Sequence, residues 1–301
     1  MIPTRLLTGL LVLTTCLGTL SCAHATSPAV TPTNAPPPAT KQLRDTHERL
    51  NGLLWVQTSA EYHVLAAATY RDAWQRVQNL LDQAKAGKAL PSAMIEQPGQ
   101  NSNKLPLAVI VDIDETVFDN SPMSGKLVTQ RMGYATNVWD DWVALEQADF
   151  IVGAEQFITN ARGAGLEVFF VTNRTEAEEA HTIDDLKPLV VTDEQILASK
   201  EIGTGETVPW ESEKGPRRAY LARTHWVIAM VGDDLADFVP GIRKMKAADR
   251  VTEAMKHIDR LNSQWFLLPN PLYGSWETVL YNLADPDDKQ LTDKIGKVKS
   301  Y

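Results

Sequence analysis

The spacing of apolar residues changes along the chain, and in its first part after the leader and tether this spacing predicts helices. Between residues 41 and 86, apolar side chains recur mostly three, four or seven positions apart among charged ones, which is the spacing of an amphipathic helix. We expect two helices there, separated near Gly52 or Ser59. Residues 87–106 hold three prolines and two glycines and are predicted to form a linker.

Short apolar runs follow the linker and predict buried strands. The run at 107–113 is continuous, and similar runs occupy 166–171, 227–231 and 265–268. Helical stretches are predicted between them at 153–163, 175–187 and 214–223. Strands that alternate with helices predict an α/β fold with a Rossmann-like parallel sheet flanked by helices. The sequence has neither a GxxxxGK loop nor a GxGxxG turn, so nucleotide-loop folds are not supported.

The first 25 residues have the composition of an export signal. Arg5 precedes an apolar run of about 15 residues, which is too short to span a bilayer comfortably. Two processing sites compete, because residues 19–22 (TLSC) resemble a bacterial lipobox while residues 23–25 (AHA) fit ordinary signal peptidase. We favour the lipobox, which predicts a signal peptide at 1–21, a lipid anchor on Cys22 and a Pro/Thr-rich tether at 22–40. The alternative, cleavage after Ala25, predicts a soluble periplasmic or secreted protein.

Composition argues against one class of partner and shows that disulfide bonds do not stabilise the folded part. The chain has 29 Lys and Arg against 38 Asp and Glu, a formal net charge of −9, which argues against a nucleic-acid polymer as partner. Its two cysteines, Cys16 and Cys22, both lie in the leader, so the folded part has no disulfide framework. The remaining length suits one globular core with a small addition.

Two acidic clusters follow predicted strands. Asp112 and Asp114 lie at the carboxyl end of the first strand, where open α/β sheets bind ligands, and alternation along an extended chain sends both to the same side. Asp233 and Asp237 follow a second strand in the segment GDDLADF. If these strands are neighbours, the clusters meet, and such an all-oxygen donor set suits Mg²⁺. A solvated acidic turn would explain the first pair alone but not both clusters.

Groups suited to binding an anion accompany the acidic clusters. Thr172, Asn173 and Arg174 end a third predicted strand just before a predicted helix, where a hydroxyl and free backbone N–H groups can receive an anion. Lys214 begins another predicted helix and can supply a positive charge to the same edge of the sheet.

Four blocks of the sequence occur together in one known family. They are the segments LWVQTSAEY (54–62), VDIDETVFDNSP (111–122), GDDLADF (232–238) and LPNPLYGSW (268–276). With them the chain resembles the class C nonspecific acid phosphatases, exported and lipoprotein members of the haloacid dehalogenase-like superfamily in bacteria. It departs from the family at Met123, where an aromatic residue is usual, and at Asp234, where Asn or Glu is usual. The resemblance implies a small, mainly helical cap, with residues 41–100 contributing to it and 101–301 forming the core with a cap insertion around 119–150.

The resemblance also implies roles for individual residues. Asp112 would be the nucleophile that forms an aspartyl phosphate, and Asp114 the general acid and base. Mg²⁺ would be held by Asp112, by the backbone carbonyl of Asp114 and by Asp233, with Asp237 farther from the ion. Thr172 and Lys214 would bind the phosphate oxygens. Asn173 and Arg174 would contact the substrate, although Arg174 could instead orient the loop or form a structural ion pair.

Aromatic residues of the predicted cap suggest the substrate. In the family, aromatic groups of this region can enclose a nucleobase, which makes Trp139, Trp142 and Tyr273 candidates, with core packing as the alternative for each. The resemblance therefore implies a Mg²⁺-dependent phosphomonoesterase for small phosphate esters, with nucleoside 5′-monophosphates and aryl phosphates as substrates. We also considered a phosphotransferase, a non-catalytic binding or storage protein on the same fold, and a sugar transferase that uses an acidic pair.

Overall fold

The computed structural model describes residues 47–99, 105–199, 211–282 and 284–300. The predicted signal peptide, the Cys22 processing site and the tether lie outside these residues. All elements described below belong to the unit that spans Thr46–Tyr301. None of the described helices combines the length and the apolar composition that a membrane span requires.

A five-stranded parallel sheet forms the centre of this unit. Its strand order is β5-β4-β1-β6-β7, so β1 lies between β4 and β6. The strands are β1 (Leu107–Val111), β4 (Glu167–Thr175), β5 (Ile196–Ser199), β6 (Trp226–Gly232) and β7 (Trp265–Leu267). This sheet confirms the predicted α/β fold. The sequence pattern missed β5, because four residues are too few to show a periodicity.

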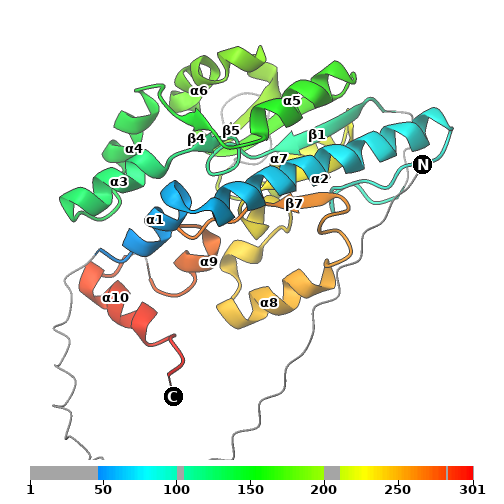
Figure 1. Cartoon of the computed structure of the whole chain (residues 1–301). Helices are drawn as coiled ribbons and strands as arrows, with labels where there is room; N and C mark the ends of the chain where they lie inside the picture. The colour runs from blue at the N-terminus through cyan, green and yellow to red at the C-terminus, as the bar shows by residue number, and fades with distance from the viewer. Residues whose placement is uncertain (1–46, 100–104, 200–210, 283, 301) are drawn as a thin grey trace, which may run out of the picture. The chain divides into compact units, whose positions relative to one another are not determined.

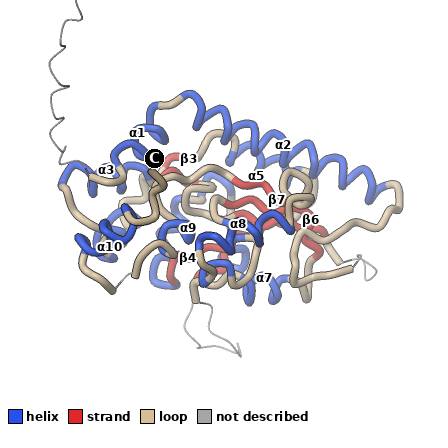
Figure 2. Tube along the Cα trace, turned by 90° about the horizontal axis from the view of Figure 1, so that it is seen from below, coloured by secondary structure: helices blue, strands red, loops and turns tan. Residues whose placement is uncertain are grey.

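Helices cover both faces of the sheet, which explains why its strands read as continuous apolar runs. Val109, Val111 and Phe170 pack in the cluster formed with α2 (Ala60–Lys85) and α5 (Ala154–Gly163). The alternate residues Ala108 and Ile110 pack on the other face in a cluster that includes α7 (Gly215–Leu221). Figure 1 shows α2 and α5 running across the sheet, and Figure 2 shows α7 on the side opposite to α2.

The predicted N-terminal helical segment is divided at Ser59. Here α1 (Leu50–Thr58) ends and α2 begins, with the Ser59 hydroxyl accepting a hydrogen bond of 3.1 Å from the Tyr62 N–H. A serine in this position caps the free backbone donors of the new helix. The two helices serve different parts of the fold, because α1 packs against α3 (Ser121–Gln130) while α2 packs against α5, β6 and β7.

A short antiparallel ribbon brackets a helical insertion. Strands β2 (Phe118–Asp119) and β3 (Asp149–Phe150) pair with each other and enclose α3 and α4 (Thr136–Val143). Met123, Leu127 and Val138 form the small apolar cluster of these helices. The insertion falls within the range in which we expected a cap, around 119–150.

The remaining elements lie between β4 and β5, between β6 and β7, and after β7 in the chain. They are the helices α6 (Glu179–Asp185), α8 (Ala247–Lys256), α9 (Ser275–Thr278) and α10 (Asp287–Ile295), and the 3-10 turns η1 (Glu176–Glu178), η2 (Lys187–Leu189), η3 (Asp193–Gln195), η4 (Leu235–Asp237) and η5 (Ile242–Lys244). The helix predicted at 175–187 is shorter than expected, because β4 continues to Thr175 and a 3-10 turn follows it.

Candidate active site

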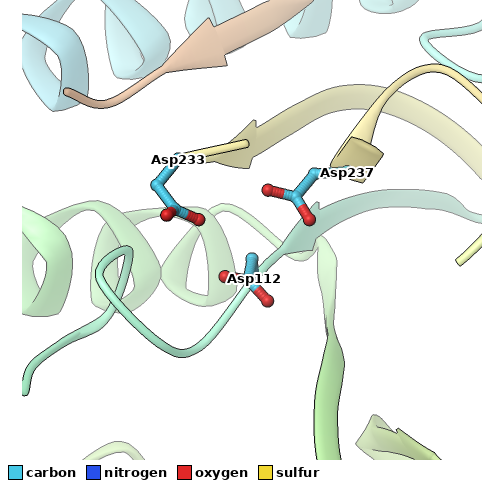
Figure 3. Close-up of side chains that lie close together, drawn as sticks. All are labelled: Asp112, Asp233 and Asp237. Atoms are coloured by element: carbon cyan, nitrogen blue, oxygen red, sulfur yellow. The ribbon is translucent and has the colours of Figure 1, made fainter. Parts of the chain in front are cut away.

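The two acidic clusters predicted from the sequence meet at the carboxyl edge of the sheet. Asp112 follows β1 and donates its backbone N–H to the Val231 carbonyl of β6 at 3.0 Å, so the ends of these neighbouring strands are locked together. Carboxylate oxygens of Asp112, Asp233 and Asp237 lie within 4.8 Å of one another. Figure 3 shows the three side chains pointing toward a common centre.

Burial and mutual repulsion make this cluster a candidate site for a cation. Burial, together with the neighbouring Asp237 and Asp112, raises the pKa of Asp233 well above its ordinary value. Burial also raises the pKa of Asp237 to about 6, although the Lys214 ammonium opposes this. Carboxylates in such a place need either protons or a cation to balance them. Because the donors are all oxygen and close enough to share one ion, they fit Mg²⁺.

Lys214 supplies part of the balancing charge. Its ammonium forms ion pairs with Asp112 and with Asp237 Oδ1, the latter at 2.6 Å. Burial lowers the pKa of Lys214, but the two carboxylates outweigh that effect and raise it. The second oxygen of Asp237 accepts the Asp234 N–H at 3.0 Å, so both of its oxygens have protein partners. Gly232 is required beside it, because a Cβ there would collide with the Asp237 carboxylate.

Two further side chains orient the carboxylates of this cluster. Asn270 donates to Asp233 Oδ2 at 2.7 Å, and it reaches this position from the loop that follows β7. Thr116 donates to Asp112 Oδ2 at 3.3 Å from the turn after β1. The first oxygen of Asp233 lies 3.5 Å from the same hydroxyl. The cluster is therefore held by groups from three different strand ends.

Asp114 is held apart from the three clustered carboxylates. Its Oδ1 accepts hydrogen bonds from Arg174 Nε and Asn120 Nδ2, each at 3.0 Å. Its side chain is 16% exposed, unlike that of Asp112 at 7%. Both bonds end on Oδ1 and fix the carboxyl group, and neither of them involves Oδ2. Such a group can exchange a proton with a ligand in the adjoining cavity.

Arg174 is held by ion pairs with two carboxylates and also faces the site. Its buried guanidinium lies 2.9 Å from Asp114 and 3.8 Å from Asp185, and it stands over the Phe118 and Trp139 rings at 5.5 and 5.8 Å. It also lines the cavity described below. Arg174 thus connects the end of β4 with the loop after β1 and with the helical insertion.

Thr172 and Asn173 lie within β4 and not at the start of a helix, where we expected them. Because β4 runs on to Thr175, Thr172 does not stand at a helix N-terminus; its hydroxyl is fully buried and accepts the Arg174 N–H at 3.1 Å. The Asn173 side chain accepts a bond of 2.7 Å from Arg217, which also donates to the Thr172 and Leu197 carbonyls. Sequence reasoning missed this fully buried arginine, since one of two consecutive arginines in a helix carries no distinctive signal.

A cavity of about 370 Å³ opens onto these groups. Of the residues predicted from the sequence, its lining includes Asp112, Asp114, Asp233, Asp237, Lys214, Asn173, Arg174, Met123, Trp139 and Tyr273, but not Thr172 or Trp142. Trp142 instead donates to Asn120 at 2.8 Å and packs in the insertion. Sequence reasoning did not identify Arg49, Tyr134, Arg243, Glu277, Thr278 and Tyr281, which also line the cavity.

Asp234, one of the two departures from the family pattern, ties two loops together. It accepts bonds from the Ser275 N–H and hydroxyl, and from the Ala236 N–H at 2.9 Å. Burial alone would raise the pKa of Asp234, but these bonds keep it below its ordinary value. Gly274 has a φ of 148°, and a Cβ there would lie 2.9 Å from Asp234 Oδ2. The hydrogen bonds between Asp234 and Ser275 fix the loop that carries Tyr273.

Comparisons with known proteins identify the family and the fold. The family model described as "HAD superfamily, subfamily IIIB (Acid phosphatase)" matches residues 39–276. The chain is similar to a structure of the class C acid phosphatase from Bacillus anthracis, with 25% identity over 85% of this chain and 98% of that chain, and a TM-score of 0.71. A crystal structure of class C acid phosphatase from the same organism with tungstate bound is 27% identical over the same shares of the two chains, with a TM-score of 0.70.

Proposed function

The chain belongs to the acid phosphatases of HAD superfamily subfamily IIIB, and from that premise we propose that it hydrolyses small phosphomonoesters through a phosphoryl group carried on Asp112, with Mg²⁺ as cofactor. One observation carries the proposal. The buried Asp112 carboxylate is bound by Lys214, lies beside the Asp233 and Asp237 carboxylates, and is followed two residues later by a second, separately held carboxyl group.

In the first step, a carboxylate oxygen of Asp112 forms a bond to phosphorus while the bond from phosphorus to the ester oxygen breaks. Asp114 gives a proton to the departing alkoxide, so the leaving group departs as a neutral alcohol. In the second step, water bonds to phosphorus, Asp114 takes a proton from that water, and the bond to Asp112 breaks to release inorganic phosphate. Two displacements through a covalent intermediate replace one more difficult displacement.

The environment of each carboxyl group suits its proposed role. Lys214 and Thr116 fix the two oxygens of Asp112 and so set the direction of attack. Arg174 and Asn120 bind Asp114 through Oδ1 and leave Oδ2 for the proton. Lys214 is also the cation within reach of the transferred phosphoryl group, whose negative charge must be balanced during transfer.

The metal would be held by Asp112, Asp233 and the backbone carbonyl of Asp114, with Asp237 supporting the site through Lys214 and Asp234. When bound, Mg²⁺ supplies positive charge that offsets repulsion between the acidic cluster and the phosphate. A related structure holds tungstate, a tetrahedral oxyanion like phosphate. This supports an oxyanion site on the fold that the two chains share.

We propose that nucleoside 5′-monophosphates are substrates and that aryl phosphates are also accepted. Four aromatic residues, Tyr134, Trp139, Tyr273 and Tyr281, line the same cavity as Asp112. Their ring faces can stack with a nucleobase or an aryl group. A volume of about 370 Å³ falls at the small end of the range for pockets that bind small molecules.

The test is a substrate panel with Asp114→Asn as the control variant. The purified protein with Mg²⁺ is expected to release phosphate from adenosine 5′-monophosphate and from p-nitrophenyl phosphate. Asp114→Asn should lose at least about 100-fold in kcat/KM on the nucleotide and clearly less in kcat/KM on the aryl ester, because kcat/KM reports the first displacement, in which a nitrophenolate departs without a proton. Absence of phosphate release from every ester in the panel would refute the function, and equal losses of kcat/KM on both esters would refute the role of Asp114 as the acid of the first step.

We further propose that the protein is exported and anchored by a lipid on Cys22, like the lipoprotein members of the family that it resembles. The lipobox-like residues 19–22 support this proposal. Cells that express the full chain should incorporate labelled palmitate into it, and Cys22→Ala should abolish the label. A labelled Cys22→Ala protein, or an unlabelled wild type with Thr26 at its N-terminus, would favour cleavage after Ala25 instead.

A further inference from the structure

Two arginines line the reaction cavity without a part in the proposed mechanism. Arg49 precedes α1, and Arg243 lies in η5. Within the described ranges, Arg49 Nη1 and Arg243 Nε are buried nitrogen atoms without any hydrogen-bond partner. Buried donors without partners cost free energy, so their retention beside a ligand cavity indicates a group that arrives with the ligand.

The other charged residues of the cavity have partners in the protein. Lys214 pairs with Asp112 and Asp237, and Arg174 pairs with Asp114. Glu277 pairs with Lys294 at 2.6 Å, and Asp234 is bound by Ser275. Asp233 belongs to the proposed metal site. Among the described residues, Arg49 and Arg243 therefore remain as cations without an ion pair to a carboxylate of the cavity, although Arg243 is near enough to Asp234 to help lower the pKa of that carboxyl group.

A third donor belongs to the same group. The Tyr273 hydroxyl is buried and has no hydrogen-bond partner among the described residues, and its ring lies 6.0 Å from the Arg49 guanidinium carbon. All three groups can donate hydrogen bonds. Arg49 and Tyr273 lie close together and Arg243 lines the same cavity, so an anion that offers several acceptor oxygens can accept bonds from them there, and guanidinium groups are well suited to phosphate.

We propose that Arg49, Arg243 and Tyr273 form a second anion subsite, which selects phosphomonoesters that carry another phosphate besides the one removed. This inference rests on the proposed function and narrows its substrate class to compounds such as nucleoside bisphosphates. The phosphate to be hydrolysed meets Asp112 and Lys214, and the second phosphate accepts bonds from the three donors. The acidic cluster would otherwise repel so highly charged a substrate.

The experiment compares adenosine 3′,5′-bisphosphate with adenosine 5′-monophosphate, which differ in the second phosphate alone. Release of the 5′-phosphate is followed by chromatography of the nucleoside products. The wild type is expected to show a kcat/KM at least about tenfold higher for the bisphosphate, mainly through a lower KM. Arg49→Gln and Arg243→Gln should each lower the ratio of the two kcat/KM values by about tenfold, the loss typical of a hydrogen bond to a charged group.

Arg71→Gln is the matched control. It removes the same charge from the outer surface of α2, where the Arg71 side chain is 64% exposed and paired with Asp72. It should leave the ratio of the two substrates unchanged. Thermal melting of all variants shows whether each one folds.

Three results would overturn the inference. They are equal efficiencies of the wild type on the two substrates, a ratio that neither Arg49→Gln nor Arg243→Gln changes, and an equal loss in Arg71→Gln. In each of these cases hydrolysis of the monophosphate would still support the proposed function. If the wild type with Mg²⁺ hydrolysed neither nucleotide nor any other monoester, the proposed function itself would fail.

Discussion

Replacing Asp112 by asparagine is expected to lower kcat by about ten-thousand-fold or more, the scale of loss seen when a catalytic nucleophile is removed. The amide has nearly the shape of the carboxylate but is too weak a nucleophile to form the phosphoryl intermediate. Structural damage should be small, because Lys214 keeps its ion pair with Asp237 and the substitution removes one of three mutually repelling carboxylates. Thermal melting of the variant in the absence of metal should therefore resemble that of the wild type.

The covalent intermediate provides a second measurement that does not depend on turnover. Acid quenching of the wild type during turnover of a ³²P-labelled monoester should trap label on the protein, and Asp112→Asn should carry none. Asp82→Asn is the matched control, because the Asp82 side chain is 75% exposed on α2 and pairs with Lys85. Label trapped on Asp112→Asn, or full activity of that variant, would exclude Asp112 as the nucleophile.

The parts of the fold that sequence could predict are those that a local pattern determines. The apolar runs of β1 and β6 show that each strand is buried on both faces, and this is sufficient to infer a parallel sheet with helices on each side. The carboxyl ends of parallel strands share one edge, so the meeting of Asp112 with Asp233 followed from the same inference. Strand β5 and the true end of β4 depend on pairing partners, and the local pattern contains no information about them.

The residues that sequence reasoning missed lie outside the motif blocks. Arg49, Tyr134, Arg243 and Tyr281 come from four distant segments, and their common cavity exists only after folding. Sequence reasoning also missed Arg218, whose contacts form only after folding. It is fully buried, donates to the Asp237 carbonyl at 2.7 Å and pairs with Glu96 of the predicted linker. The segment 87–99 thus supports the active-site edge through a contact that its loop-like composition does not reveal.

The sequence pointed to Asp234 as unusual but gave an incomplete account of its effect. From sequence it adds a negative charge near the predicted metal site. In the structure its oxygens accept three bonds from Ser275 and Ala236, and Arg250 lies 3.6 Å away. Its charge is therefore balanced locally, and its main effect is to fix the loop that bears Tyr273.

Removal of divalent metal is expected to lower kcat at least about 1,000-fold, and Mg²⁺ should restore it, because charge stabilisation by a metal ion contributes several kcal/mol to phosphoryl transfer. Asp233→Asn removes a proposed ligand and should raise the Mg²⁺ concentration needed for half-maximal activity, while Asp82→Asn should not. Full activity after exhaustive chelation would exclude a metal-dependent reaction. Restoration by Zn²⁺ but not by Mg²⁺ would exclude magnesium as the cofactor.

The pH dependence of stability tests the same site without any substrate. In the metal-free protein, Asp237 has a pKa of about 6 against 3.8 for an ordinary aspartate, and the pKa of Asp233 is also raised. The folded state then binds more protons than the unfolded state between about pH 4 and pH 6, so its free energy of unfolding should fall as pH rises through that window. Because Mg²⁺ takes the place of these protons, the increase in Tm on adding Mg²⁺ should be larger at pH 7 than at pH 5. An equal increase at both pH values, or the same increase in Asp233→Asn, would show that the ion binds elsewhere.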